Sequence, residues 1–268
     1  MLNRLDAELV RRKLARSREH AQELVEAGQV FVDGVVSSKS SRQVSNEISI
    51  VVKNLESKQY VSRGAYKLLS ALSAFASHGL DISGRQVLDA GASTGGFTQV
   101  CLEKGAAKVI AVDVGYGQLA WELRQNPRVE VIERTNIRYL EPESLSCIPN
   151  FVVADLSFIS LKTVLPALKK VCTKDVEMLL MVKPQFEVGK TDIGEGVVSD
   201  PNLRASAVIN VVESAQNLDL ALKGVVASGL PGPSGNVEYF VWLVSGGVCK
   251  DKPTVEKMVE TAVKEGPQ

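Results

Sequence analysis

Four charged residues stand at the ends of predicted strands and helices, where they could transfer protons. They are Lys67, Asp155, Lys183 and Glu238. Asp155 and Lys183 each end a strongly apolar stretch, at the sheet edge where open α/β folds bind ligands. Burying charges there costs free energy unless they pair, and two lysines can pair with two carboxylates. Taken singly, each residue is more typical of a solvated surface charge than of a catalyst.

A glycine-containing loop lies within "VLDAGASTGGFTQV", residues 87–100. No lysine follows the glycines as in a Walker phosphate loop, and the dinucleotide fingerprint G-x-G-x-x-G is absent. Asp89 could receive an ammonium group, and Asp113, at the end of the next strand, could accept hydrogen bonds from ribose hydroxyls. S-adenosylmethionine, a nucleoside with a cationic tail and no phosphate, suits these acids; alternatively, Asp113 caps the next helix. A side chain at Gly95 is expected to enter the ligand space.

Together, the loop and the charged set suit methyl transfer to a ribose hydroxyl. The hydroxyl must lose its proton as it attacks a sulfonium methyl group, and a lysine can accept that proton if desolvation or a like charge lowers its pKa. We expect Lys183 to be this base, with Lys67 supplying the like charge and orienting the ribose. Asp155 and Glu238 would hold the lysines and position the hydroxyl.

The first 57 residues are predicted to form a small α+β domain. Ser17 is a candidate N-cap for a helix over residues 18–27, and a shorter helical pattern precedes it. The segments "QVFV" and "VVSS" flank the turn pair Asp33-Gly34 and predict a hairpin, with "EISIVV" as a further strand. Residues 58–63 are expected to form a linker.

Residues 64–268 alternate between strand and helix patterns, which predicts a parallel sheet covered on both faces. Helices are expected near residues 97–104, 117–125, 160–171 and 201–217. The last of seven strands, "VEYFVWLV", follows a turn with no helix between, so it must pair antiparallel. The expected fold is therefore α/β and Rossmann-like, with a seven-stranded, mostly parallel sheet, in the arrangement of methyltransferases.

Composition gives no sign of metal or membrane chemistry. The 31 basic residues balance the 31 acidic ones, so attraction to nucleic acid depends on local clustering. The four cysteines form no C-x-x-C pair and the only histidines are His20 and His78, so we expect no metal site. The N-terminus is charged and no apolar run is long enough to span a bilayer, which predicts a cytoplasmic protein without stable membrane association.

Motifs along almost the whole chain resemble the TlyA family, the hemolysin-named group of FtsJ-like ribosomal RNA 2′-O-methyltransferases, and especially its actinobacterial members. They include "VSRGAYKL", "LDAGASTGGFTQVCLEKGAAKVIAVDVGYGQLAW", "ERTN", "VVADLSFISL", "VKPQFEVGK" and "LPGPSGNVEYF". The resemblance implies that the family's catalytic tetrad falls on the four charged residues above. It implies that the substrates are cytidines in small- and large-subunit ribosomal RNA. The implied contacts to S-adenosylmethionine are Asp89, Gly91, Ser93, Thr94, Gly95, Gly96, Phe97, Asp113, Asn136 and Asp155.

The N-terminal domain resembles the small RNA-binding domain shared by a small-subunit ribosomal protein and pseudouridine synthases. Its run "RRKLARSR", residues 11–18, contains five basic residues and no acid. Such a run is usually a solvated helix face, but the surrounding framework favours phosphate contacts. The expected RNA contacts are Arg4, Arg11, Arg12, Arg16, Arg18, Arg63 and Phe158. Two alternatives stay open: a catalytically silent ribosome-assembly factor, and a membrane-active hemolysin. The sequence does not define the oligomeric state.

Overall fold

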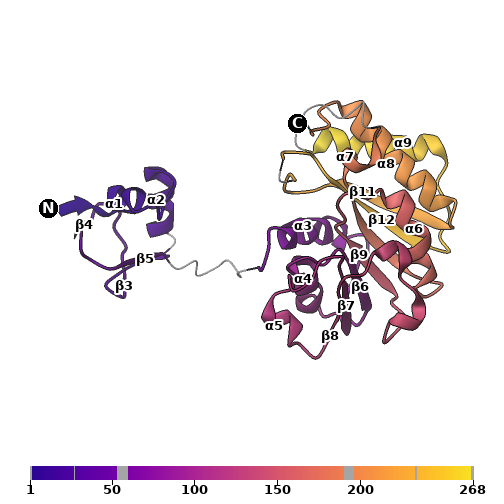
Figure 1. Cartoon of the computed structure of the whole chain (residues 1–268). Coiled ribbons are helices and arrows are strands. Elements are labelled where there is room, and N and C mark those ends of the chain that lie inside the picture. The colour runs from indigo at the N-terminus through magenta and orange to yellow at the C-terminus, as the bar shows by residue number, and fades with distance from the viewer. Residues whose placement is uncertain (1, 27, 53–59, 190–195, 233, 267–268) are drawn as a thin grey trace. The chain divides into compact units, whose positions relative to one another are not determined.

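The computed structural model describes residues 2–26, 28–52, 60–189, 196–232 and 234–266. The chain divides into two compact units, Met1–Gln59 and Tyr60–Gln268 (Figure 1). Residues 58 and 59 of the expected linker lie outside the described residues. Its remaining four residues belong to the second unit, because Tyr60 Oη hydrogen-bonds to Glu103 (2.9 Å) and Val61 N to Gln99 Oε1 (3.0 Å).

The first unit packs two helices against short strands. The helices are α1 (Leu5–Arg11) and α2 (Arg18–Glu26), and the expected three-stranded sheet consists of β2 (Val30–Val32), β3 (Val35–Val36) and β5 (Ile50–Val52). Ser17 Oγ accepts a hydrogen bond from His20 N, which confirms the predicted N-cap. Sequence patterns did not predict the pairing of β1 (Leu2–Arg4) with β4 (Gln43–Ser45), because three-residue strands show no usable alternation.

The second unit is built on a seven-stranded sheet with the order β11-β12-β10-β9-β6-β7-β8. β12 pairs antiparallel with both of its neighbours, β10 and β11, whereas the pairings among β10, β9, β6, β7 and β8 are parallel. The predicted mostly parallel sheet with an antiparallel last strand is therefore confirmed. The strands are β6 (Gln86–Ala90), β7 (Lys108–Val112), β8 (Val129–Ile132), β9 (Phe151–Ala154), β10 (Glu177–Val182), β11 (Leu220–Ala227) and β12 (Tyr239–Ser245).

Helices cover both faces of this sheet (Figure 1). One face carries α3 (Gly64–Ala76), α4 (Gly96–Glu103) and α5 (Trp121–Arg124), and the other carries α6 (Leu161–Lys170), α8 (Pro201–Gln216) and α9 (Lys252–Glu265). Short elements near the sheet edges are α7 (Pro184–Glu187) and the 3₁₀ turns η1 (Ile137–Tyr139) and η2 (Pro142–Ser144).

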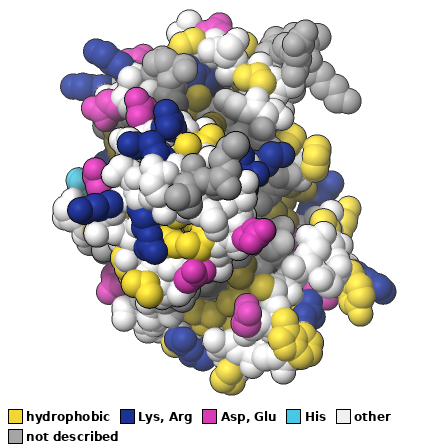
Figure 2. All heavy atoms as spheres, turned by 90° about the vertical axis from the view of Figure 1, so that its left-hand side faces the viewer, with side chains coloured by type: hydrophobic (Ala, Val, Ile, Leu, Met, Phe, Trp, Pro, Cys, Tyr) yellow, Lys and Arg dark blue, Asp and Glu magenta, His cyan; other side chains and the backbone are white. Residues whose placement is uncertain are grey.

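Three helices differ from the sequence predictions. The helix expected over residues 117–125 is confined to α5, because Gly117 has a left-handed φ of 69° and Ala120 is extended. Helices α3 and α9 were not predicted. In the view of Figure 2, basic and acidic side chains are interspersed, in keeping with the balanced net charge.

Candidate active site

Two lysine–carboxylate pairs form the polar centre of the second unit. Lys67 Nζ lies 2.5 Å from Glu238 Oε2, and Lys183 Nζ lies 2.5 Å from Asp155 Oδ1. Lys67, Lys183 and Glu238 are buried, and Asp155 is partly exposed. Buried charges of this kind require a partner, since a lone one carries a large desolvation cost. All four side chains line one cavity of about 830 Å³.

The sheet topology explains how these distant residues meet. Parallel strands β9 and β10 are neighbours, so Asp155 and Lys183, which follow them directly, emerge side by side at the same edge. β12 runs the opposite way, and Glu238, which precedes it, therefore lies at that edge too. Lys67 enters from α3, on the face of the sheet that α4 also covers.

The glycine loop approaches the segment after β9 very closely. Gly91 has a φ of 86°, and a Cβ built there would lie 2.7 Å from the Asp155 backbone oxygen. Asp113 holds the loop in place: its Oδ2 accepts from Ser93 N (2.8 Å) and its Oδ1 from Gly115 N (2.7 Å). Only glycine permits this backbone geometry and this spacing together.

A second cavity, of about 470 Å³, adjoins the first. Five of the expected donor contacts line this cavity: Gly91, Ser93, Asp113, Asn136 and Asp155. Asn136 also caps η1, because its side chain accepts a hydrogen bond from Arg138 N. The residues shared by both cavities are Gly91, Ser93, Asp155, Ser157 and Phe158.

Other expected donor contacts lie away from the described linings of these two cavities. These are Asp89, Thr94, Gly95, Gly96 and Phe97. A Cβ at Gly95 would meet Leu123 Cδ1 at 2.3 Å and Leu119 Cδ1 at 2.8 Å, so a side chain there would point at these leucines and not into ligand space as expected; the contact of Gly95 itself with the donor stays a prediction. Phe97 is buried and stacks on Phe240, with ring centroids 6.1 Å apart.

Asp89 is enclosed in the protein interior rather than exposed in the loop. It lies within β6, is fully buried, and accepts a hydrogen bond from Thr98 Oγ1 of α4 (2.6 Å). Burial raises the pKa of Asp89 to about 7. Its Oδ1 has no hydrogen-bond partner among the described residues.

Sequence reasoning missed several residues that line the first cavity. Ser157 accepts a hydrogen bond from Lys183 Nζ (2.9 Å), and Phe186 packs against Phe158 with ring centroids 5.2 Å apart. Asn236 is buried and bridges two backbone groups, accepting from Val198 N and donating to Gly196 O. The one signal in the sequence that could have indicated these residues is their proximity to Asp155, Lys183 and Glu238.

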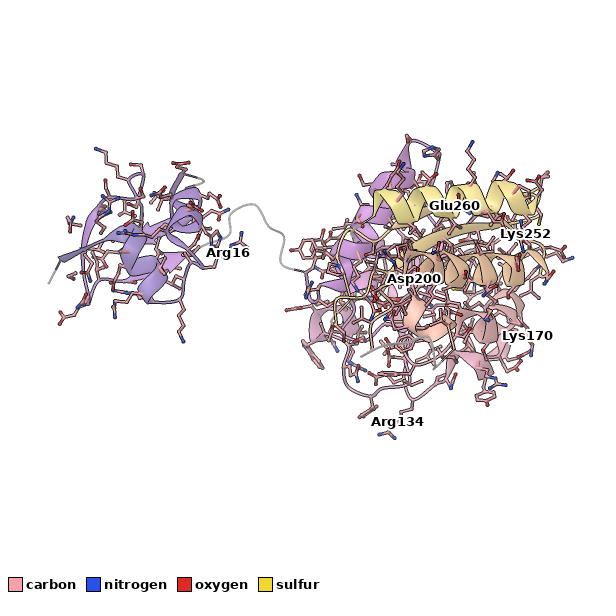
Figure 3. The ribbon with its side chains drawn as sticks, turned by 90° about the horizontal axis from the view of Figure 1, so that it is seen from above. Arg16, Arg134, Lys170, Asp200, Lys252 and Glu260 are labelled. Carbon is pink, nitrogen blue, oxygen red and sulfur yellow. The ribbon has the colours of Figure 1, made fainter. Side chains whose placement is uncertain are left out.

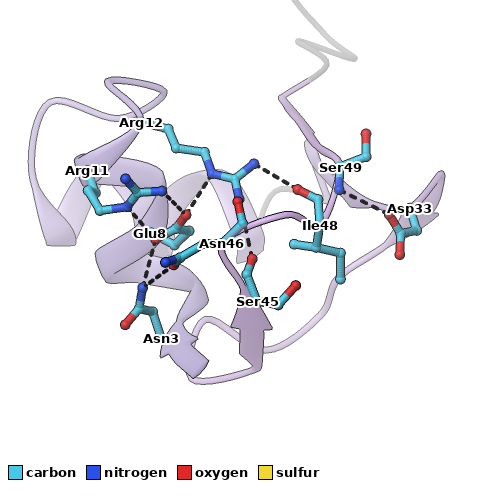
Figure 4. Close-up of polar contacts among 9 residues, drawn as sticks. All are labelled: Asn3, Glu8, Arg11, Arg12, Asp33, Ser45, Asn46, Ile48 and Ser49. Atoms are coloured by element: carbon cyan, nitrogen blue, oxygen red, sulfur yellow. Dashed lines mark hydrogen bonds and ion pairs between the residues drawn. The ribbon is translucent and has the colours of Figure 1, made fainter. Parts of the chain in front are cut away.

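Most of the arginines expected to contact RNA have acidic partners in the first unit, and Figure 4 shows those of Arg11 and Arg12. Arg11 and Arg12 both hydrogen-bond to the buried Glu8, which lowers the pKa of that carboxyl to about 2. Arg12 also donates to the backbone oxygens of Ile48 and Asn46, both at 2.8 Å. Arg12 therefore holds this domain together, a role that the run of basic residues does not reveal.

The remaining expected RNA contacts are all exposed. Arg4 pairs with Asp6 at 2.8 Å, and Arg18 lies 3.8 Å from the same carboxylate. Arg16 is exposed and extends from the surface of the first unit (Figure 3). In the second unit, Arg63 lines the first cavity, and Phe158 is 91% exposed at its mouth, with a left-handed φ of 64°.

Among the described residues, no helix is long and apolar enough to cross a membrane. The same part of the chain contains no group of three or more histidine, cysteine or acidic side chains placed to hold a metal ion.

Comparison with known proteins places this geometry in a family. Residues 60–245 match the FtsJ-like methyltransferase family, and residues 3–47 match the S4 domain. The 16S/23S rRNA (cytidine-2′-O)-methyltransferase TlyA of Mycobacterium tuberculosis is 54% identical over 266 residues, which cover 98% of each chain. This chain belongs to the TlyA family.

Two further proteins match almost the whole length of this chain. The putative rRNA methyltransferase YqxC of Bacillus subtilis is 37% identical, covering 97% of this chain and 94% of its own. The solved structure of a putative hemolysin from Streptococcus thermophilus has a TM-score of 0.73 at 37% identity, covering 98% of this chain and 96% of that one. The family expected from the sequence motifs is thus confirmed.

Proposed function

We propose that this TlyA-family protein is an S-adenosylmethionine-dependent methyltransferase that modifies the ribose 2′-hydroxyl of cytidines in small- and large-subunit ribosomal RNA. The observation that carries the proposal is the set of two buried lysine–carboxylate pairs in a cavity that adjoins the glycine loop. The FtsJ-like match and the name of the M. tuberculosis relative support the same reaction. Ribosomal subunits, and hence the cytoplasm, are its expected place of action.

The second cavity has the chemical character that a sulfonium nucleoside requires. Among the described residues that line it, Asp113 and Asp155 are acidic and none is basic, which favours a cation and disfavours a phosphate. After binding the loop amides, each Asp113 oxygen retains a lone pair for a ribose hydroxyl. The apolar side chains available to an adenine ring are Val112, Val114, Ile137, Leu156 and Ile159. When bound, S-adenosylmethionine would supply the electrophilic methyl group.

The first cavity supplies the groups that act on the ribose. Lys183 accepts the proton of the attacking 2′-hydroxyl, and Asp155 keeps its amine in place. Lys67, fixed by Glu238, presents a positive charge that orients the ribose oxygens. Holding the hydroxyl in line between the two cavities removes much of the entropic part of the barrier.

RNA capture is divided between the two units. The S4 domain exposes Arg16 and Arg18, which can neutralise phosphates. In the second unit, Arg63 contributes a positive charge to the catalytic cavity, and the exposed ring of Phe158 offers a stacking surface to the target base.

Mapping of ribose methylation by mass tests this proposal. Purified protein and S-adenosylmethionine are incubated with ribosomal subunits from cells that lack the enzyme, and rRNA fragments are analysed for 2′-O-methylcytidine. Lys183→Ala should abolish transfer while leaving donor affinity in calorimetry unchanged. Lys170→Ala is the matched control, because this exposed lysine pairs with Glu141 on the surface of α6.

Each alternative function predicts a different experimental result. Methyl groups on bases, or none in any rRNA fragment, would refute the ribose methyltransferase. Binding of subunits without transfer would identify an assembly factor, and lysis of erythrocytes by the purified parent protein would identify a hemolysin. Transfer at the parent rate by Lys183→Ala would assign the proton acceptor to another group.

A further inference from the structure

Lys183 makes two polar contacts in the first cavity. Its Nζ lies 2.5 Å from Asp155 Oδ1 and donates a hydrogen bond to Ser157 Oγ at 2.9 Å. The first contact is an ion pair, which sets the distance between the two groups, whereas the second is a hydrogen bond, which also sets the direction of an N–H bond. An N–H bond held on Ser157 Oγ limits the directions in which the lone pair of the amine can point when it accepts a proton.

From this geometry we propose that Ser157 is a positioning residue, which together with Asp155 aims the lone pair of Lys183 at the ribose hydroxyl. The inference rests on the proposed function, because it concerns the same proton transfer. In that step the hydroxyl O–H bond breaks, its electron pair stays on oxygen, and the proton binds to the lysine lone pair. The resulting ammonium keeps its hydrogen bond to Ser157 and its ion pair with Asp155, so the lysine need not move.

The two segments that carry this contact are joined at two further places. Phe158, which follows Ser157, packs its ring on that of Phe186. Glu187 accepts hydrogen bonds from Ser160 Oγ (2.5 Å) and Leu161 N (2.7 Å). These contacts hold the segment after β9 against the segment after β10, so the serine hydroxyl is fixed relative to the lysine.

Loss of the hydroxyl would leave the amine with only one fixed partner. The Nζ group could then rotate about the Cε–Nζ bond while it kept its contact with Asp155, and the lone pair would point at the substrate for only part of the time. Misorientation of a reacting group commonly costs about 10- to 100-fold in rate. Ser157 lines both cavities, but its hydroxyl is not among the proposed donor or RNA contacts, so the loss should fall on the rate and not on donor or RNA affinity.

Single-turnover methyl transfer provides the test, with the parent protein, Ser157→Ala, Ser157→Thr and Ser160→Ala measured in parallel on ribosomal subunits. Ser157→Ala should lower the maximal rate about 10- to 100-fold, with the donor Kd and the KM for subunits unchanged. Ser157→Thr retains the hydroxyl and should restore most of the rate. Ser160→Ala removes one of the two hydrogen bonds to Glu187 and the cap of α6, but Leu161 N still donates to Glu187 and keeps the two segments joined, so this variant should keep the parent rate.

Three results would overturn the inference: the parent rate in Ser157→Ala, failure of threonine to restore the rate, or an equal loss in Ser160→Ala. The parent protein separates the two proposals. If it forms 2′-O-methylcytidine while Ser157→Ala is equally fast, only the role of Ser157 fails. If the parent itself forms none, the proposed function fails and this inference fails with it.

Discussion

Replacing Gly91 by alanine should separate two costs that the structure assigns to this position. The first is conformational: an L-residue at a φ of 86° costs about 1–2 kcal/mol. The second is steric, because the new Cβ would lie 2.7 Å from the Asp155 backbone oxygen and 3.1 Å from Leu156 Cδ2. Forcing extra volume into a packed site costs about 1–3 kcal/mol, so the total is about 2–5 kcal/mol.

Gly79 offers a matched control for the conformational cost. It has a φ of 90°, and a Cβ there would meet nothing within 4 Å. Gly79→Ala should therefore lower stability by only about 1–2 kcal/mol. For a unit of this size, each kcal/mol shifts Tm by about 2–4 °C, so scanning calorimetry can resolve the two variants.

The two variants should also differ in donor binding. In Gly91→Ala the Asp155 segment must move, and with it the Asp155 carboxylate that lines both cavities and pairs with Lys183. S-adenosylmethionine affinity, measured by isothermal titration, should fall steeply in Gly91→Ala and remain at the parent value in Gly79→Ala. Equal Tm shifts together with equal donor affinity would show that the loop does not approach the strand end as closely as described.

Two further predictions concern charges whose partners in the fold the sequence alone did not reveal. The pKa of Asp89 is raised from 3.8 to about 7, so the folded state binds an extra proton between these values, and stability should fall as pH rises through that window. Asp89→Asn should flatten this pH dependence of Tm and be more stable than the parent at pH 8; an unchanged slope would contradict the burial argument. Arg12→Ala should lower the Tm of the first unit, since it breaks bonds to buried Glu8 and two backbone oxygens, whereas Arg16→Ala should leave Tm unchanged. If Arg16 contacts a phosphate, its loss should reduce the log–log salt slope of rRNA binding by about one unit, and the reverse pattern would refute this division of roles.

The sheet and the tetrad were predictable because both follow from apolar runs and from where these runs end. β9 and β10 are continuous apolar segments followed directly by Asp155 and Lys183, and the short turn before β12 permits only antiparallel pairing. Helix α3 was not assigned from sequence. The position of Lys67 was therefore predicted without the element that carries it.

The surroundings of Asp89, Gly95 and Arg12 could not be predicted for one shared physical reason, the direction of side chains. Asp89 lies on the same face of β6 as Val87, which packs in the cluster under α3 and α4, so the carboxyl points beneath α4. The position of Gly95 is limited by Leu119 and Leu123, which approach from a later segment. Arg12 contacts Glu8 four residues earlier and backbone groups far along the chain, and a local count of charges detects neither.

The antiparallel strand has a functional consequence in this sheet. Glu238 immediately precedes β12, and it reaches the catalytic edge only because β12 begins where β9 and β10 end. A parallel last strand would place the same residue at the opposite edge, a full strand length from Lys67. Lys67 would then be a buried charge without its partner, which costs several kcal/mol. Because β12 runs antiparallel to β10, Glu238 can pair with Lys67 in the first cavity.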